Sequence, residues 1–188
     1  IIMVRNFLLK SDKSPKNVQI KKDIINHFIT TGNATIAELS KELDLSVPTI
    51  TKFIAELKDQ GLIAELGKIQ TPGGRHPSVY GLNPTSAYFV GVDMSRHHLN
   101  IALMDFTGNI VEYQTGISYT YENTTESFDM LCDHIRKFID KTGELKKKIF
   151  NINLNISGRV NPESGYSYSS FYFSESPISE TLTKRMNY

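Results

Sequence analysis

The chain has 188 residues, of which 39% are hydrophobic and 22% are charged, a balance typical of globular proteins rather than disordered or fibrous ones. Its length suits two compact units, each able to bury its own core. No apolar run reaches the ~20 residues that a membrane span needs, and the first residues lack the features of a signal peptide. The single cysteine, Cys132, excludes an internal disulfide, so we expect a reducing cytoplasm.

The net charge of +1 is distributed unevenly along the chain. Residues 1–85 carry eleven Lys and Arg against eight Asp and Glu, which leaves +3, whereas residues 86–188 carry ten against twelve, which leaves −2. Many solvated protein surfaces carry a similar excess of positive charge, but a positive first half also suits contact with nucleic-acid phosphates. The first residue is Ile rather than Met, which favours a piece of a longer chain.

Residues 1–17 are expected to be an extension, and the first helix is predicted over residues 18–31. Its apolar side chains recur at helical spacing and so form one stripe along the helix. The stripe consists of Ile20, Ile24, Ile25, Phe28 and Ile29, and the residues outside it include Lys21, Lys22 and Asn26. Gly32-Asn33 ends the helix because glycine tolerates a positive φ.

Two further helices are predicted, separated by the short turn Asp44-Leu45. Thr35 and Glu38, three positions apart, form the capping-box pattern that begins the second helix. Ser46 caps the third helix, where Pro48 in the first turn costs little because the first N–H groups of a helix lack partners. The inner face of the second helix is Ile36, Leu39 and Leu43, and the buried seam of the third is Val47, Ile50, Ile54 and Leu57.

The second and third helices have the spacing of a helix-turn-helix, in which the later helix enters the major groove of DNA. The face opposite the seam carries Pro48, Lys52, Ala55 and Asp59, flanked by Thr49, Thr51 and Glu56. We expect the N-terminal part of this face to contact bases or phosphates. The predicted contacts are Ser46, Pro48, Thr49, Thr51 and Lys52. Periodicity alone fits an ordinary helical bundle equally well.

A predicted hairpin favours the DNA-binding interpretation. Residues 62–66 and 78–82 are expected strands, joined by a basic segment rich in Gly and Pro. A helix-turn-helix followed by such a hairpin is a winged helix, here residues 18–82. Gly73-Gly74 lets the backbone approach DNA closely, and Arg75 suits the narrow minor groove of A·T-rich DNA. The alternative is a merely mobile hairpin tip.

From Asn83 onward the pattern is that of an α/β unit. Strands are predicted over residues 88–93, 99–105 and 110–119, with a tight turn at Gly108-Asn109 between the last two. An amphipathic helix over residues 124–142 and a further strand over residues 149–156 follow. Strands, then a helix, then another strand are typical of an α/β fold.

Motifs on both sides of the junction between the two predicted domains resemble those of the ROK family of repressors, open reading frames and sugar kinases. They are Gly73-Gly74-Arg75-His76-Pro77, Leu82-Asn83-Pro84, the strand Tyr88-Phe89-Val90-Gly91-Val92-Asp93, the following strand pair, and the loop from Ile156-Ser157-Gly158-Arg159 to Gly165. The resemblance spans roughly residues 19–188. It implies an α/β fold in which the winged helix-turn-helix precedes a partial actin-like, ribonuclease-H-like lobe of the ROK sugar-kinase type, over residues 83–188.

The chain departs from the family's kinases at the turn after its first predicted strand. Those kinases hold ATP phosphates with a glycine-rich turn, whereas this turn reads Asp93-Met94-Ser95-Arg96-His97-His98. Bulky side chains would block the close backbone approach that phosphates require. Arg96 remains a candidate for binding an anion, with surface solvation as the alternative. Ser157 stands where the family usually has proline. The family's sugar-contacting, catalytic and zinc-binding residues correspond to no residue here.

Other chemistry has weak support in the residue pattern. The adjacent His97 and His98 would face opposite sides of a strand and could not easily share a metal ion, so no metal or cofactor is expected. Asp93 and Asp105 could form an acid–base pair where strand ends meet, although solvation of strand ends is commoner.

The sequence therefore predicts a cytoplasmic repressor of sugar-utilisation genes that resembles ROK regulators and is not an enzyme. Its winged helix would read a double-stranded DNA operator, and the complete second domain would sense a sugar or sugar phosphate. A homodimer or higher homo-oligomer is expected because paired recognition helices match pseudo-palindromic half-sites. Two alternatives remain, namely a ROK-type sugar kinase with an appended DNA-binding domain and a winged helix used only for protein contacts.

Overall fold

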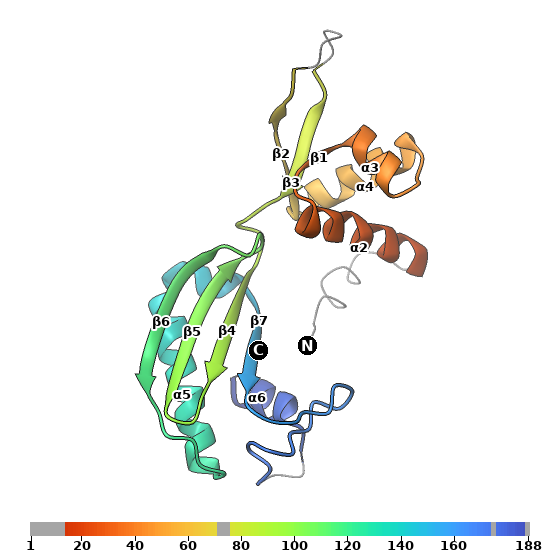
Figure 1. Ribbon diagram of the computed structural model, residues 1–188. Helices are drawn as coiled ribbons and strands as arrows, with labels where there is room; N and C mark the ends of the chain where they lie inside the picture. Colours follow the sequence, from red (N-terminus) through yellow and green to blue (C-terminus); the bar gives the residue numbers. More distant parts are fainter. Residues whose placement is uncertain (1–13, 71–75, 174–175, 187–188) are drawn as a thin grey trace. The chain divides into compact units, whose positions relative to one another are not determined.

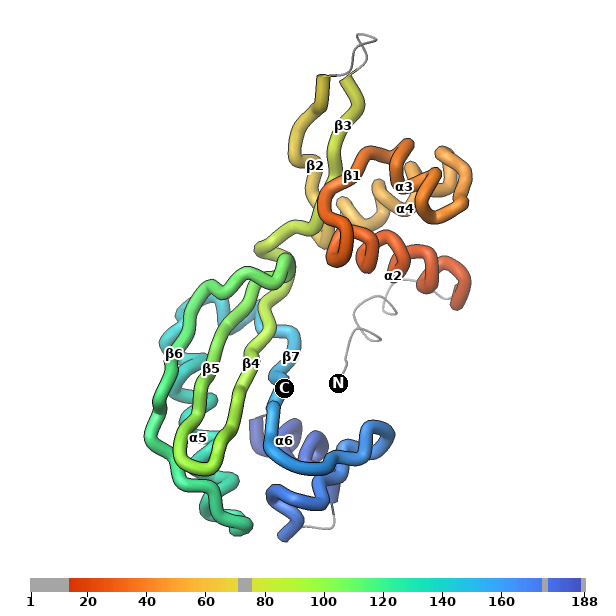
Figure 2. The backbone as a smooth tube through the Cα atoms, in the orientation of Figure 1, coloured from red at the N-terminus to blue at the C-terminus, as the bar shows by residue number. Residues whose placement is uncertain are grey.

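The computed structural model describes residues 14–70, 76–173 and 176–186. The chain divides into two compact units after Ser86, and each unit is described by itself (Figures 1 and 2). No helix in the described ranges is long and apolar enough to cross a bilayer.

The first unit packs helices against a small antiparallel sheet of order β1-β3-β2. Its elements are α2 (Pro15–Thr30), β1 (Ala34–Thr35), α3 (Ile36–Glu42), α4 (Val47–Asp59), β2 (Ile63–Lys68) and β3 (Ser78–Leu82). Strands β2 and β3 form a hairpin that extends beyond the helices in Figure 1. This arrangement confirms the predicted winged helix-turn-helix.

Both ends of the first unit differ from the predicted boundaries. Helix α2 begins at Pro15 rather than at residue 18, because proline suits the first helical position, where its missing N–H leaves no bond unmade. The unit ends after Ser86 rather than after Leu82. The reason is that Asn83 bonds back to this unit, its backbone N–H donating to Leu62 O at 3.0 Å and its Nδ2 to Gly61 O at 2.9 Å.

The second unit is a mixed sheet of order β6-β5-β4-β7, in which β7 runs parallel to β4 and the other pairs are antiparallel. Its elements are β4 (Tyr88–Met94), β5 (His98–Asp105), β6 (Ile110–Ser118), α5 (Thr125–Lys141), the 3-10 helix η1 (Gly143–Lys148), β7 (Ile149–Ile156) and α6 (Ile178–Met186). Helix α5 makes the crossover to β7 and lies behind the sheet in Figure 1. The predicted α/β lobe is thus confirmed.

The core of the second unit lies between α5 and one face of its sheet. Alternate strand residues point to this face, as period-2 geometry requires. The buried residues include Val90, Val92, Leu99, Ile101 and Leu103 of the strands and Phe128, Leu131 and Ile135 of α5. The opposite face carries the intervening residues, among them Gly91, Asp93, Asn100 and Ala102 together with the larger Phe89 and Met104.

Three side chains differ from the prediction in whether they are buried or exposed. Lys21 is buried, because it precedes Ile24, Ile25 and Phe28 at helical spacing and so shares their face. Ile29 is 63% exposed, since it lies about 100° around the helix from Phe28. Val47 is 51% exposed, because it stands at the first position of α4, ahead of the packed seam.

Candidate nucleic-acid interface

Capping positions define the start of each helix in the helix-turn-helix. The Thr35 hydroxyl accepts from the Glu38 N–H at 3.3 Å, and a Glu38 carboxylate oxygen accepts from the Thr35 N–H at 2.8 Å. These bonds form the predicted capping box and lower the pKa of the Glu38 carboxyl, because the Thr35 backbone and side-chain hydrogen bonds favour its charged form. The Ser46 hydroxyl caps α4 by accepting from the Thr49 N–H at 3.3 Å.

The hydroxyl groups at the start of α4 are engaged within the helix. Ser46 Oγ and Thr49 Oγ1 share a hydrogen bond of 2.8 Å, which leaves one of their two hydroxyl hydrogens for a ligand. Thr51 Oγ1 donates to Val47 O at 2.8 Å, so this hydroxyl can approach DNA mainly as an acceptor. Pro48 is exposed beside them. Donation to phosphate from the described part of this face therefore depends chiefly on a lysine.

Lys52 supplies an accessible positive charge on this face. Its side chain is 61% exposed, and its ammonium lies 5.2 Å from the centroid of the Phe53 ring and 3.9 Å from Glu56 Oε1. The ring holds the aliphatic stem against α4 while the ammonium stays in water. Phe53 was not part of the predicted seam, yet it is buried with Ile50.

The described part of the wing is held to α4 by a charged cluster. The Ser78 hydroxyl and the Lys58 ammonium donate to the Glu65 carboxylate at 2.6 and 3.2 Å and lower its pKa. Lys58 also lies 5.6 Å from the Tyr80 ring centroid. The predicted tip contacts Gly73, Gly74 and Arg75 lie outside the described residues, so their role stays a prediction.

A buried ion pair behind the interface was missed from the sequence. The Lys21 ammonium lies 2.7 Å from Glu56 Oε2, and 1% of its side chain is exposed. This bond joins α2 to α4 across the core. The helical spacing of Lys21 relative to Ile24 and Phe28 was a signal for its burial, but the partner could be identified only once the two helices were packed.

The second unit contains a cavity of about 480 Å³ at the carboxyl ends of β4 and β7. Its walls are Met94, Ser95, Arg96, Tyr121, Glu122, Asn123, Ser157, Ser169 and Ser170. The carboxyl ends of the two parallel strands meet here, and open α/β sheets commonly bind ligands at this end of their strands. Asn123 Oδ1 is buried without a hydrogen-bond partner among the described residues. Polar groups of this cavity could therefore bind a small polar ligand.

The turn that separates β4 from β5 closes on itself without glycine. The Ser95 N–H and hydroxyl both donate to His98 O at 3.0 Å, and the His98 N–H donates to Ser95 Oγ at 3.3 Å. Arg96 and His97 are exposed on this turn. This turn thus presents the side chains of Arg96 and His97 to solvent.

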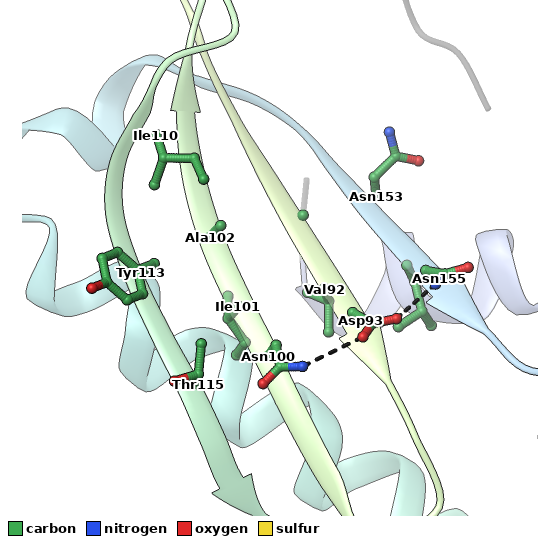
Figure 3. A pocket seen from close by; sticks show the side chains of 12 residues that line it. Val92, Asp93, Asn100, Ile101, Ala102, Ile110, Tyr113, Thr115, Asn153 and Asn155 are labelled. Atoms are coloured by element: carbon green, nitrogen blue, oxygen red, sulfur yellow. Dashed lines mark hydrogen bonds between the residues drawn. The ribbon is translucent and has the colours of Figure 1, made fainter.

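Asp93 lies on the open face of the sheet, at the edge of a second cavity of about 470 Å³ (Figure 3). Its two carboxylate oxygens accept from Asn155 Nδ2 at 2.6 Å and from Asn100 Nδ2 at 3.4 Å. Asn100 Oδ1 in turn accepts from the Gly116 N–H at 3.0 Å, so a polar ladder crosses the sheet. Asp93 therefore serves as an acceptor that ties strands together.

The considered pairing of Asp93 with Asp105 is wrong. In the antiparallel register Asp93 faces Asn100 whereas Asp105 faces Tyr88, which places the two carboxyl groups at opposite ends of the strands. Asp105 instead organises the turn into β6, accepting from the Thr107 and Asn109 N–H groups at 2.8 and 3.0 Å. Burial raises the pKa of this carboxyl, but these hydrogen bonds outweigh the burial and lower it overall.

Residues 19–64 match the family model described as winged helix-turn-helix DNA-binding. The xylose repressor of Caldicellulosiruptor bescii is 27% identical over 128 residues, which cover 68% of this chain and 32% of the repressor. The xylose repressor of Bacillus subtilis is 26% identical over 145 residues, covering 76% of this chain and 37% of that protein. The DNA-binding transcriptional dual regulator NagC of Escherichia coli is 25% identical over 135 residues, with coverages of 71% and 33%. The chain thus spans about a third of these relatives' length.

The fold of both units is also found in a solved structure. The crystal structure of a ROK family transcriptional regulator, a homologue of the E. coli MLC protein, aligns with a TM-score of 0.67 at 20% identity. The alignment covers 92% of this chain and 44% of that chain, so it extends through the winged helix and into the α/β lobe. Together with the matching repressors, these findings support a ROK family transcriptional regulator.

Proposed function

We propose that this chain is the DNA-reading and first ligand-sensing part of a cytoplasmic repressor of sugar-utilisation genes. The observation that carries the proposal is the exposed N-terminal face of α4, on which Lys52 presents an ammonium to solvent from a rigid, capped helix. Relatives named xylose repressor and N-acetylglucosamine repressor support the connection with sugars.

In this proposal α4 lies in the major groove of a double-stranded operator. Ser46, Pro48, Thr49 and Thr51 approach base edges and the sugar-phosphate backbone, while Lys52 binds a phosphate. Gly73, Gly74 and Arg75 of the wing reach an adjacent minor groove. A homodimer places two such surfaces on the half-sites of a pseudo-palindrome.

The effector in this proposal is a sugar or sugar phosphate that binds the complete second domain. The cavity at the ends of β4 and β7 supports this role, because its serine hydroxyls, Asn123 amide and Arg96 can bond to hydroxyl or phosphate groups. Binding shifts the population between arrangements that fit the operator and arrangements that do not.

The contacts of strand β4 and of the turn after it favour a regulator over a sugar kinase. Asp93 is bonded to two asparagine amides, and the following turn carries the side chains of Arg96 and His97 instead of glycine. ATP-dependent phosphorylation of a hexose by a protein that carries this chain would overturn this choice.

Fluorescence anisotropy with duplexes selected from a random pool tests the DNA contacts. We expect Lys52→Ala to weaken binding to all selected duplexes and to reduce the slope of log affinity against log salt by about one. Arg75→Ala should weaken mainly duplexes with A·T-rich flanks. Lys147→Ala, an exposed lysine of η1, is the matched control and should change neither property. Parental affinity in both test variants would contradict the proposed surface.

A further inference from the structure

The Lys21–Glu56 pair places a lysine inside the core of a small unit and its carboxylate partner at the edge of that core. An ammonium with 1% of its side chain exposed is costly unless a charged or polar partner compensates for its lost hydration. Glu56 Oε2 provides that partner at 2.7 Å, and the Phe53 ring centroid lies 6.0 Å from the same ammonium. The pair therefore determines which way one oxygen of the Glu56 carboxylate faces.

Glu56 also borders the surface proposed to bind DNA. It follows Lys52 by one helical turn, is 34% exposed, and its second oxygen lies 3.9 Å from the Lys52 ammonium. An uncompensated carboxylate at this place would oppose DNA binding in two ways, because it repels phosphate and competes with phosphate for the lysine. Acidic side chains so placed need a counter-charge.

We propose that Lys21 is a positioning residue that neutralises Glu56 from inside the core and so leaves Lys52 available to DNA phosphate. The proposal rests on the proposed function, because it assigns a role to a residue that cannot itself reach DNA. The two distances carry it, since the carboxylate makes its short contact with the buried ammonium and its long contact with the exposed one.

The surroundings of Glu56 favour a stronger contact of its carboxylate with Lys21 than with Lys52. Coulomb attraction grows as the distance and the local dielectric fall, so Glu56 is held more strongly by Lys21 than by solvated Lys52. Phe53 lies next to both ammonium groups, which are 6.0 and 5.2 Å from its ring centroid. Lys52 thus stays beside the helix without forming a close ion pair.

The first test compares Lys21→Met with the parent in the full chain, using anisotropy with a selected duplex. Without Lys21, Glu56 turns to Lys52, and we expect affinity to fall about eightfold at ~0.1 M salt, the effect of losing one phosphate contact with a slope of −0.9. The salt slope should become shallower by about one. Lys22→Met, which removes a neighbouring charge of α2, is the matched control and should keep the parental slope.

A double-mutant cycle separates this role from a merely structural one. Lys52→Ala should weaken binding in the parent but change it little in the Lys21→Met background, because Lys52 is already captured there. Adding Glu56→Gln to Lys21→Met should restore affinity to within about threefold of the parent. Persistence of the full Lys52 effect in Lys21→Met would overturn the inference while leaving the DNA-binding function intact.

Glu56→Gln alone keeps the inference testable where Lys21→Met fails to fold by circular dichroism. If Lys21 neutralises Glu56, this nearly isosteric change leaves DNA affinity within about threefold of the parent. A tenfold rise would show that Glu56 opposes DNA despite Lys21, and the inference would be wrong. Absence of DNA binding by the parent itself would instead contradict the proposed function.

Discussion

The two units of the chain differ in what they bury. The first unit encloses a lysine that is paired with a glutamate, whereas the buried polar residues described in the second unit are the serines Ser127, Ser167 and Ser170. A buried ion pair contributes little net stability but imposes a specific geometry, while apolar burial stabilises without direction. The ion pair therefore helps to orient α4 in the first unit, whereas the apolar core of the second unit supports a larger sheet.

The units also differ in how their surface polar groups are satisfied. On α4 the hydroxyls bond within the helix and leave the Lys52 ammonium in water, which suits a polyanion. On the open sheet face, the Asp93 carboxylate accepts hydrogen bonds from Asn100 and Asn155, so its charge is stabilised by neighbouring strands. An ammonium is thus exposed on the first unit, whereas the Asp93 carboxylate of the second unit is hydrogen-bonded within the sheet.

The largest loss of unfolding free energy is expected from Phe128→Ala. Phe128 is fully buried and lies edge-on to Phe171, with ring centroids 5.0 Å apart. Truncation should lower the free energy of unfolding of the second unit by about 3–5 kcal/mol, measured by urea denaturation. Leu39→Ala is the counterpart in the first unit, with an expected loss of about 2–5 kcal/mol. Equal shifts of one common transition would show that the two cores are not energetically separate.

The thiol of Cys132 provides a second test, because it is the chain's one cysteine and lies in the core of the second unit. Burial raises the pKa of this thiol to about 11, so its reactive thiolate is about a hundredfold scarcer than for a thiol of pKa 9. We expect a disulfide reagent to label native protein slowly and urea-unfolded protein rapidly. Prompt labelling of the native chain would contradict a closed apolar core.

A smaller effect is expected at the capping box of α3. Thr35→Ala should cost about 1 kcal/mol of first-unit stability, because the Glu38 N–H loses its acceptor. Since the pKa of Glu38 is lowered by folding, its carboxylate contributes stability above the ordinary value of 4.5, and this contribution is lost as pH falls through the lowered pKa. Melting temperatures of the parent and Glu38→Gln should therefore converge at acidic pH. A gap that is constant with pH would rule out this contribution.

The smallest effect is expected from Val47→Ala. Because half of Val47 is exposed, its truncation should change the free energy of unfolding by less than about 0.5 kcal/mol in the same denaturation experiment. Ile50→Ala, one turn further into the seam and fully buried, should cost about 2–5 kcal/mol. A large loss at Val47 would restore the sequence-based prediction that it belongs to the core.

Much of the fold followed from local patterns. Thr35 with Glu38, Ser46 with Pro48, and the turn at Gly108 mark element ends through bonds between residues only a few positions apart, and such bonds are readable from spacing. The Lys52 face was likewise predictable, because helical periodicity assigns a direction to each side chain once the buried seam is recognised.

Contacts between distant segments lay beyond those patterns. The Lys21–Glu56 pair, the Asp93 ladder to Asn155, and the separation of Asp93 from Asp105 all depend on helix packing and strand register. Most helices and strands were therefore predictable from the sequence, because capping bonds and periodicity involve residues close together in the chain, and the family resemblance followed from short motifs. Only the tertiary structure decided which charges are paired and which remain exposed, because electrostatic energy depends on distances through space and on burial.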